Sequence, residues 1–141
     1  MQYGEALNYL DEHASYEKTG RVDSPSLVNI ETFMDLMGQP HLSYPVIHVT
    51  GTNGKGSVCA MLEALYRENG YKVGFFSSPH LVHLGERAQV NRQILSAEEV
   101  VRYTEQLKPI AAELGKDDSD LHPTFIEFIT AMAFLRFAAE S

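Results

Sequence analysis

The stretch that decides the fold is residues 46–57, which read VIHVTGTNGKGS. Its first four residues are mostly β-branched and lie between a proline and a run of glycines, which predicts a strand that leads into a tight turn. From Lys55 onward apolar residues recur at helical spacing, so we expect a helix that ends near Gly70. The predicted order is therefore a strand, a glycine-rich loop with one lysine, and a helix.

That order suits the binding of a polyphosphate. Backbone N–H groups of such a loop and of the helix N-terminus point toward an anion, and the lysine adds a full positive charge. An ordinary glycine turn with a solvent-facing lysine is the alternative. The three glycines, Lys55, the hydroxyl of Ser57 and the flanking elements together favour a site for nucleotide phosphate.

The loop departs from the Walker A pattern G-x-x-x-x-G-K-[ST] at two positions. Val49 stands where the first glycine is expected, and Gly56 follows Lys55 where a serine or threonine is expected. The hydroxyl that usually holds Mg²⁺ is therefore missing from its place. Either Ser57 or a hydroxyl from another loop would have to replace it.

A second polar region follows the next predicted strand. Residues 72–76, KVGFF, predict a strand, and together with residues 46–70 they form a βαβ pattern that implies a parallel sheet. Residues 77–81, SSPHL, would leave the carboxyl end of this strand, where open α/β sheets bind ligands. A Ser-Pro turn with a capping serine is the alternative. A further short strand is predicted at residues 88–92.

Three segments resemble the folylpolyglutamate synthase and dihydrofolate synthase family, which belongs to the Mur ligase superfamily. They are GTNGKGS at 51–57, SSPHL at 77–81 with GER at 85–87, and TFIEF at 124–128. The resemblance implies an α/β fold, a P-loop-containing three-layer domain with a partial, mostly parallel sheet that is truncated relative to the family. Residues 1–141 would form the N-terminal part of a Mur-ligase-like ATP-binding domain, and the family's C-terminal glutamate-binding domain would be absent.

The resemblance also implies an activity. It indicates an ATP-dependent ligase that adds L-glutamate to folate or dihydropteroate through an acyl phosphate, with ATP and Mg²⁺ as cofactors. The 141-residue chain alone is expected to be inactive. Two alternatives remain, a non-catalytic ATP-binding module and a generic P-loop small-molecule kinase. A kinase would explain the glycine loop but not SSPHL.

Individual site residues follow from the same resemblance. Lys55 would be catalytic, neutralising the transferring phosphoryl group, and Ser77 would bind Mg²⁺, with the remaining metal ligands beyond Ser141. The implied ATP-binding residues are Gly51, Thr52, Asn53, Gly54, Lys55, Gly56 and Ser57. The candidates for contact with pterin or folate are Thr19, Gly20, Arg21, His80, Arg87, Thr124 and Phe125.

Two of these candidates also have simple structural explanations. Arg87 could equally be a solvated surface arginine. Thr124 and Glu127 match a capping box, S/T-x-x-E, which accounts for the threonine without any ligand.

Composition excludes several other classes of protein. A formal net charge of -8 argues against nucleic-acid binding, and the single cysteine, Cys59, cannot form an internal disulfide, which fits a reducing compartment. No secretory signal or membrane-spanning segment is visible, so we expect a cytoplasmic protein without a membrane partner. An open sheet edge and uncovered apolar surface around residues 125–137 predict self-association of the chain.

The rest of the chain predicts helices that serve packing. One is expected over residues 2–14, and another from Ser24-Pro25 to Gly38. The capping box at residues 96–99 predicts a long amphipathic helix that Pro109 should kink or divide. The final helix, which begins near residue 124, is apolar nearly all round and should be buried on several sides.

Overall fold

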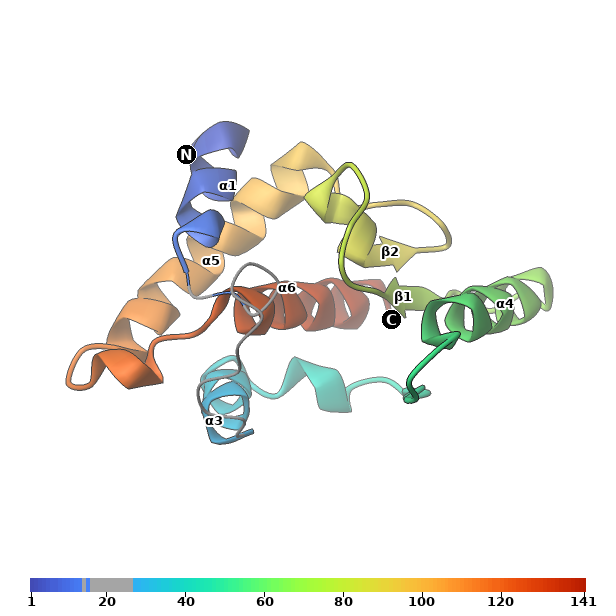
Figure 1. Ribbon diagram of the computed structural model, residues 1–141, viewed down its shortest axis with the longest axis horizontal. Coiled ribbons are helices and arrows are strands. Elements are labelled where there is room, and N and C mark those ends of the chain that lie inside the picture. Colours follow the sequence, from blue (N-terminus) through green and yellow to red (C-terminus); the bar gives the residue numbers. More distant parts are fainter. Residues whose placement is uncertain (14, 16–26) are drawn as a thin grey trace.

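The computed structural model describes residues 1–13, 15 and 27–141. Figure 1 shows helices packed around one central helix, with a small hairpin beside it and one helix set apart. The described elements are α1 (Tyr3–Asp11), α3 (Val28–Leu36), η1 (Pro40–Leu42), α4 (Lys55–Glu68), β1 (Gly74–Phe76), η2 (Leu84–Arg87), β2 (Ala88–Val90), α5 (Ala97–Leu114), η3 (Ser119–Leu121) and α6 (Phe125–Glu140).

The core is built around α6, as its apolar surface predicted. Phe128, Ile129 and Met132 are buried, and α6 contacts α1, α3, α5, η1 and β2 (Figure 1). The one arginine of this helix, Arg136, is also buried, and its Nη1 donates to the backbone carbonyls of Ala88 and Gln93. These bonds give the Nη1 of a buried charge its partners and fix the hairpin to the core helix, and the carboxylate of Glu99 lies 3.7 Å from Arg136 Nε.

The sequence signals at helix ends are confirmed. Ser96 with Glu99, and Thr124 with Glu127, form the two predicted capping boxes, and each satisfies orphan N–H groups of a first helical turn. Of the two effects predicted for Pro109, a kink or a division of the long helix, division is wrong, because α5 continues through it from Ala97 to Leu114. The N-terminal helix is confirmed but shorter than predicted, ending at Asp11.

The predicted parallel sheet is not what the structure shows. The two strands pair antiparallel, with Gly74 opposite Val90 and Phe76 opposite Ala88. Residues 46–49, the predicted first strand, form no strand, and within the described chain no backbone hydrogen bond joins residues 45–50 to another segment. A strand needs a neighbour to accept and donate its ladder bonds, and the described residues provide none beside this segment.

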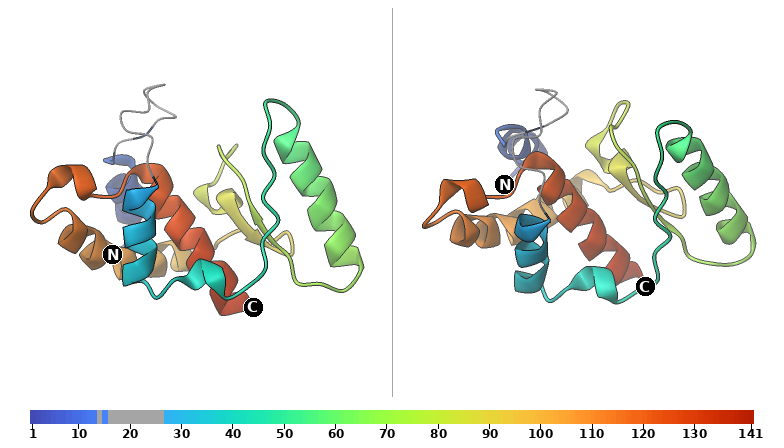
Figure 2. Two further views of the ribbon diagram at one scale, coloured as in Figure 1. Left: turned by 90° about the horizontal axis from the view of Figure 1, so that it is seen from below. Right: turned by 60° about the horizontal axis from the view of Figure 1, so that its bottom comes forward.

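The exposed apolar surface also lies elsewhere than predicted. Residues 125–137 belong mostly to the core, so the expectation of uncovered surface there is wrong. Exposed apolar side chains instead include those of residues 46–47 and of α4, where Met61 and Leu65 are 59% and 62% exposed, and those of the loop at residues 81–82. Figure 2 shows the segment before α4 running between that helix and the rest of the molecule.

Some predictions fall on residues that the structure does not describe. Thr19, Gly20 and Arg21, the helix start at Ser24-Pro25 and most of the polar loop before it lie outside the described residues. Among the described helices, none combines the length and apolarity needed to cross a membrane.

Candidate nucleotide and substrate site

The glycine-rich loop opens directly onto a helix N-terminus. Gly54 is the N-cap of α4 and has a left-handed φ of +78°, a conformation that a residue with a Cβ adopts only under strain. Lys55 is the first helical residue. The first bond of the helix runs from the N–H of Val58 to the carbonyl of Gly54, so helix geometry leaves the N–H groups of residues 55–57 without an intrahelical acceptor.

The lysine is held at this loop rather than extended into solvent. Lys55 Nζ donates to the carbonyl oxygen of Gly51 at 2.6 Å, which places a full charge beside the N-terminal end of the helix dipole. Residues 51–58 are all exposed, so the cluster of N–H groups and the ammonium is accessible. Unpaired N–H groups beside an ammonium have the chemistry that a phosphate chain requires, and the assignment of residues 51–57 to phosphate stays a prediction.

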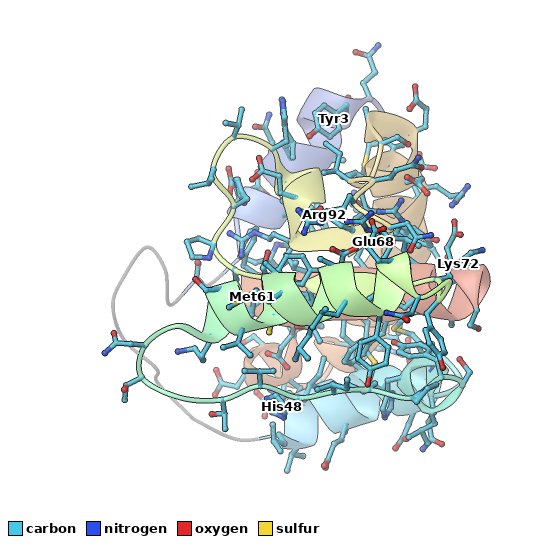
Figure 3. The ribbon with its side chains drawn as sticks, turned by 90° about the vertical axis from the view of Figure 1, so that its right-hand side faces the viewer. Tyr3, His48, Met61, Glu68, Lys72 and Arg92 are labelled. Atoms are coloured by element: carbon cyan, nitrogen blue, oxygen red, sulfur yellow. The ribbon has the colours of Figure 1, made fainter. Side chains whose placement is uncertain are left out.

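A buried carboxylate fastens α4 to the hairpin. Glu63 is only 3% exposed, and its two oxygens accept from Arg67 Nε at 2.7 Å and from Arg92 Nε at 2.5 Å. Figure 3 shows Arg92 next to α4, on the side opposite His48. Burial by itself raises the pKa of Glu63, but the hydrogen bonds from Arg92 and Arg67 outweigh it and hold the pKa below its ordinary value.

The second polar region, SSPHL, begins where β1 ends. The N–H of Ser77 donates to the carbonyl of Arg87 at 3.1 Å, which continues the hairpin by one bond beyond the strand. Ser77 is half-buried and Ser78 is exposed. Figure 2 shows this loop and the glycine-rich loop at the same end of the molecule in both views.

Glu86 holds the second half of this loop, a role that the sequence analysis did not assign to it although GER was noted at residues 85–87. Its carboxylate accepts from the backbone N–H groups of Leu81, Val82 and His83, at 3.0, 2.9 and 2.6 Å. The bond from His83, followed by those from Leu81 and Val82, lowers the pKa of Glu86 to about 2, so it is ionised at neutral pH. It forms a capping box with His83 at the N-cap, and a search restricted to serine or threonine there cannot detect it.

Three of the predicted substrate residues meet at one place. Arg87 Nε donates to His80 Nδ1 at 2.7 Å, and the guanidinium carbon of Arg87 lies 5.1 Å from the ring centroid of Phe125. Arg87 is 2% exposed, so the alternative of a solvated surface arginine is wrong. The guanidinium also covers one face of Phe125, which restricts any stacking of a ligand on that ring.

Thr124 is committed to the helix cap. Its hydroxyl donates to Glu127 Oε1 at 2.8 Å and accepts from the N–H of Glu127 at 3.4 Å. The structure therefore gives Thr124 the structural role that the capping-box alternative predicted. Its place beside Phe125 keeps it near the His80–Arg87 pair.

The described residues contain no cluster of three or more histidine, cysteine, aspartate or glutamate side chains that could hold a metal ion. The glycine-rich loop carries the hydroxyls of Thr52 and Ser57 and the amide oxygen of Asn53, and the loop after β1 carries the hydroxyls of Ser77 and Ser78. Hydroxyl oxygens are hard ligands of the kind that Mg²⁺ accepts, usually together with water and phosphate oxygens. The site therefore fits a contribution to magnesium binding, but not a complete protein cage.

The glycine-rich loop followed by a helix has the local arrangement of a phosphate-binding loop, and comparison with known proteins identifies relatives of the chain. No protein-family model matches the chain. Folylpolyglutamate synthase, mitochondrial, from Cricetulus griseus is 37% identical over 150 residues, covering 99% of this chain and 26% of the relative. The dihydrofolate synthase/folylpolyglutamate synthase of Bacillus subtilis is 39% identical over 114 residues, covering 81% of this chain and 26% of the relative.

Solved structures give the same result. The folylpolyglutamate synthase of Thermotoga maritima matches with a TM-score of 0.87 and 40% identity, covering 98% of this chain and 30% of that one. A complex of folylpolyglutamate synthase with AMPPCP and folate matches with a TM-score of 0.88 and 26% identity, covering 99% and 33%. The chain is thus homologous over its whole length to the N-terminal part of folylpolyglutamate synthases. It spans about a quarter of the length of these curated relatives.

Proposed function

We propose that this chain is the ATP-binding N-terminal part of a folylpolyglutamate or dihydrofolate synthase. The observation that carries the proposal is the glycine-rich loop, in which left-handed Gly54 starts α4 and Lys55 stands at the first helical position. The similar protein solved with AMPPCP and folate supports ATP and a folate-type compound as the ligands. The glutamate site is proposed to lie outside residues 1–141.

In the proposed reaction a substrate carboxylate takes the γ-phosphoryl group of ATP to form an acyl phosphate, and the amine of glutamate then displaces phosphate. A carboxylate resists attack by an amine, so this activation is chemically necessary. The N–H groups at the start of α4 hold phosphate oxygens, and Lys55 offsets charge on the transferring group. The contribution of this part of the chain is therefore positioning and electrostatic stabilisation.

We propose Ser77 as the magnesium ligand that this chain supplies, because Gly56 occupies the usual hydroxyl position of the loop. Ser77 lies at the carboxyl end of β1, at the same end of the molecule as the glycine-rich loop (Figure 2). The hydroxyl of Ser77 would hold the ion, and the charge of the ion would offset that of the phosphates. Ser78 is the adjacent hydroxyl and the obvious rival for this role.

Substitution of Ser77 by alanine is expected to abolish most of the increase in AMPPCP affinity that Mg²⁺ produces. Ser57→Ala should lower AMPPCP affinity to a similar extent with and without the metal, because Ser57 is assigned to phosphate. The measurement is calorimetric titration of each variant with AMPPCP, in the presence of Mg²⁺ and of EDTA. If Mg²⁺ no longer raises AMPPCP affinity in Ser78→Ala or Ser57→Ala, but still does so in Ser77→Ala, then Ser77 is not the metal ligand.

We also propose that residues 46–49 form a strand of a parallel sheet in the longer protein. Val46 and Ile47 are 62% and 58% exposed, although a strand of a parallel sheet is normally buried on both faces. The apolar side chains of α4 are exposed beside them, as expected for a helix whose sheet is incomplete. This open surface is also the motive for expecting self-association of residues 1–141.

The function itself is tested by incubating residues 1–141 with ATP, Mg²⁺, dihydropteroate and glutamate and searching for the glutamylated product by mass spectrometry. We expect AMPPCP binding by titration but no product, because the glutamate site is proposed to lie elsewhere. Product above the no-enzyme control, lost in Lys55→Ala, would contradict that placement. Phosphorylated dihydropteroate formed equally well without glutamate and stable to hydroxylamine would favour the small-molecule kinase instead.

We propose the cytoplasm as the compartment of this chain. The composition favours the cytoplasm, whereas the relative from Cricetulus griseus is named as mitochondrial. Both compartments keep thiols reduced, which is all that the single cysteine requires.

A further inference from the structure

The buried Arg87 determines which nitrogen of His80 carries a proton. Arg87 Nε bears a hydrogen and always donates, and it points at His80 Nδ1 from 2.7 Å. Nδ1 must therefore present its lone pair. In a neutral imidazole the other nitrogen then carries the hydrogen, so His80 Nε2 is a donor.

The surroundings hold this arrangement in place. Arg87 is 2% exposed and lies against Phe125, so its guanidinium cannot swing out to solvent without opening the packing. The backbone carbonyl of Arg87 accepts a hydrogen bond from the N–H of Ser77. The carboxylate of the neighbouring Glu86 accepts from the N–H groups of residues 81–83. His80 is therefore fixed both through its ring and through the loop on either side of it.

A protonated His80 does not fit this geometry. A second proton on Nδ1 would face the N–H of Arg87, replacing a hydrogen bond by contact between two donors and two positive charges. While the pair is intact, Nδ1 is occupied as the acceptor of the hydrogen bond from Arg87. What the imidazole offers is a neutral N–H at Nε2, on a side chain that is half-buried rather than covered.

We infer that Arg87 is a positioning residue that holds His80 as the neutral Nε2–H tautomer, and that His80 donates this hydrogen to an acceptor atom of the folate-type substrate. The identity of that ligand rests on the proposed function; the tautomer does not. Arg87 acts through His80 and does not itself contact the substrate. This role differs from the bidentate capture of an anion for which an exposed arginine would be suited.

The tautomer is tested directly in the unmodified chain. The two ring nitrogens differ widely in ¹⁵N chemical shift according to whether they carry a hydrogen, so a long-range ¹H–¹⁵N spectrum at neutral pH assigns both. We expect His80 Nδ1 to be the unprotonated nitrogen and Nε2 the protonated one. Arg87→Gln and Arg87→Lys should shift His80 toward a mixture of tautomers. A proton on Nδ1 in the unmodified chain would overturn the inference without any variant.

The donor role is tested by two matched variants of His80. The side-chain oxygen of Asn can replace Nδ1 as the acceptor for Arg87, and the side-chain nitrogen of Gln can replace Nε2 as the donor. With AMPPCP and Mg²⁺ present, His80→Asn should weaken folic acid binding about tenfold, the scale of one lost hydrogen bond, and His80→Gln should weaken it less. Equal affinities of the unmodified chain and His80→Asn, or AMPPCP binding without any folic acid binding, would overturn the donor role.

Failure of this inference is distinguishable from failure of the proposed function. If the chain does not bind AMPPCP, the nucleotide site is wrong, but the spectrum of the free chain still decides the tautomer. If AMPPCP and folic acid both bind and the His80 ring signals do not move on addition of folic acid, the function stands and the donor role is wrong. Lys72→Ala serves as the control, because its side chain pairs with Glu140 away from this loop.

Discussion

Replacement of Lys55 by alanine is expected to weaken AMPPCP binding by on the order of 10- to 150-fold, because a hydrogen bond to a charged group contributes about 1.5–3 kcal/mol. Lys55 is the first residue of α4, and its ammonium already lies 2.6 Å from the carbonyl oxygen of Gly51. No other lysine or arginine lies within residues 51–58, so no nearby side chain of that loop can replace the charge. The fold should be retained, because residues 51–58 are exposed and contribute nothing to the core.

Lys72→Ala is the matched control for this experiment. Lys72 is also an exposed lysine, and it forms an ion pair with Glu140 at 3.4 Å. Exposed pairs of this kind contribute about 0–1 kcal/mol, so the substitution should change neither stability nor nucleotide affinity appreciably. Isothermal titration of both variants with AMPPCP and Mg²⁺ gives the comparison. Equal losses of affinity in the two variants would remove the basis for placing phosphate at the glycine-rich loop.

The parts of the site that sequence could predict are those fixed by neighbours in the chain. The start of α4 at Lys55 follows from the glycines before it and the helical spacing after it. The caps at Ser96 and Thr124 depend on a residue only three positions away. Such features form wherever the local sequence permits them, so their prediction does not depend on the rest of the fold.

The sheet could not be predicted in the same way, because pairing is decided by distant residues. Residues 46–49 have the composition of a buried strand, but a strand exists only when another segment bonds to it. β1 pairs with β2, which follows it through the Glu86-fixed loop, and this antiparallel hairpin needs no crossover helix. The βαβ pattern therefore located the helix α4 and the strand β1, but residues 46–49 form no strand in the described chain and β1 pairs with β2 instead.

The burial of the charged residue Arg87 could not be predicted from the sequence either. Arg87 is a charged residue at the start of a short predicted strand, and nothing in its local sequence says which side it faces, so a surface position was an equal alternative. One of the groups that cover it is Phe125, which is 38 positions away at the start of α6 and lies against its guanidinium. The Glu63 network has the same origin, since its partner Arg92 lies 29 positions further on. Within this network, only the pair of Glu63 with Arg67 can be recognised from the local sequence, because the two residues are four positions apart on one helix.

Gly85→Ala is expected to be the most damaging single methyl addition in the described chain. A Cβ at Gly85 would lie 2.2 Å from the backbone oxygen of Leu95 and 3.1 Å from its carbonyl carbon and nitrogen. The atoms that would have to move belong to the backbone, and the N–H of Leu95 also donates to the Gly85 carbonyl at 3.1 Å. Overpacking typically costs about 1–3 kcal/mol, and this contact should reach or exceed the upper end.

The control for this substitution is Gly4→Ala in α1, where an added Cβ would meet no atom within 4 Å. That variant should be stabilised by roughly 0.5–1 kcal/mol, because alanine loses less conformational freedom than glycine in a helix. Urea denaturation followed by circular dichroism compares the midpoints of both variants with the unmodified chain. An unchanged midpoint for Gly85→Ala would mean that the backbone of Leu95 can move away from the added Cβ at low cost. Glu86 and Arg87 would then be held less rigidly than the distances indicate. A folded but destabilised Gly85→Ala should lose the fixed His80 tautomer while it still binds AMPPCP, because the glycine-rich loop is formed by a separate segment.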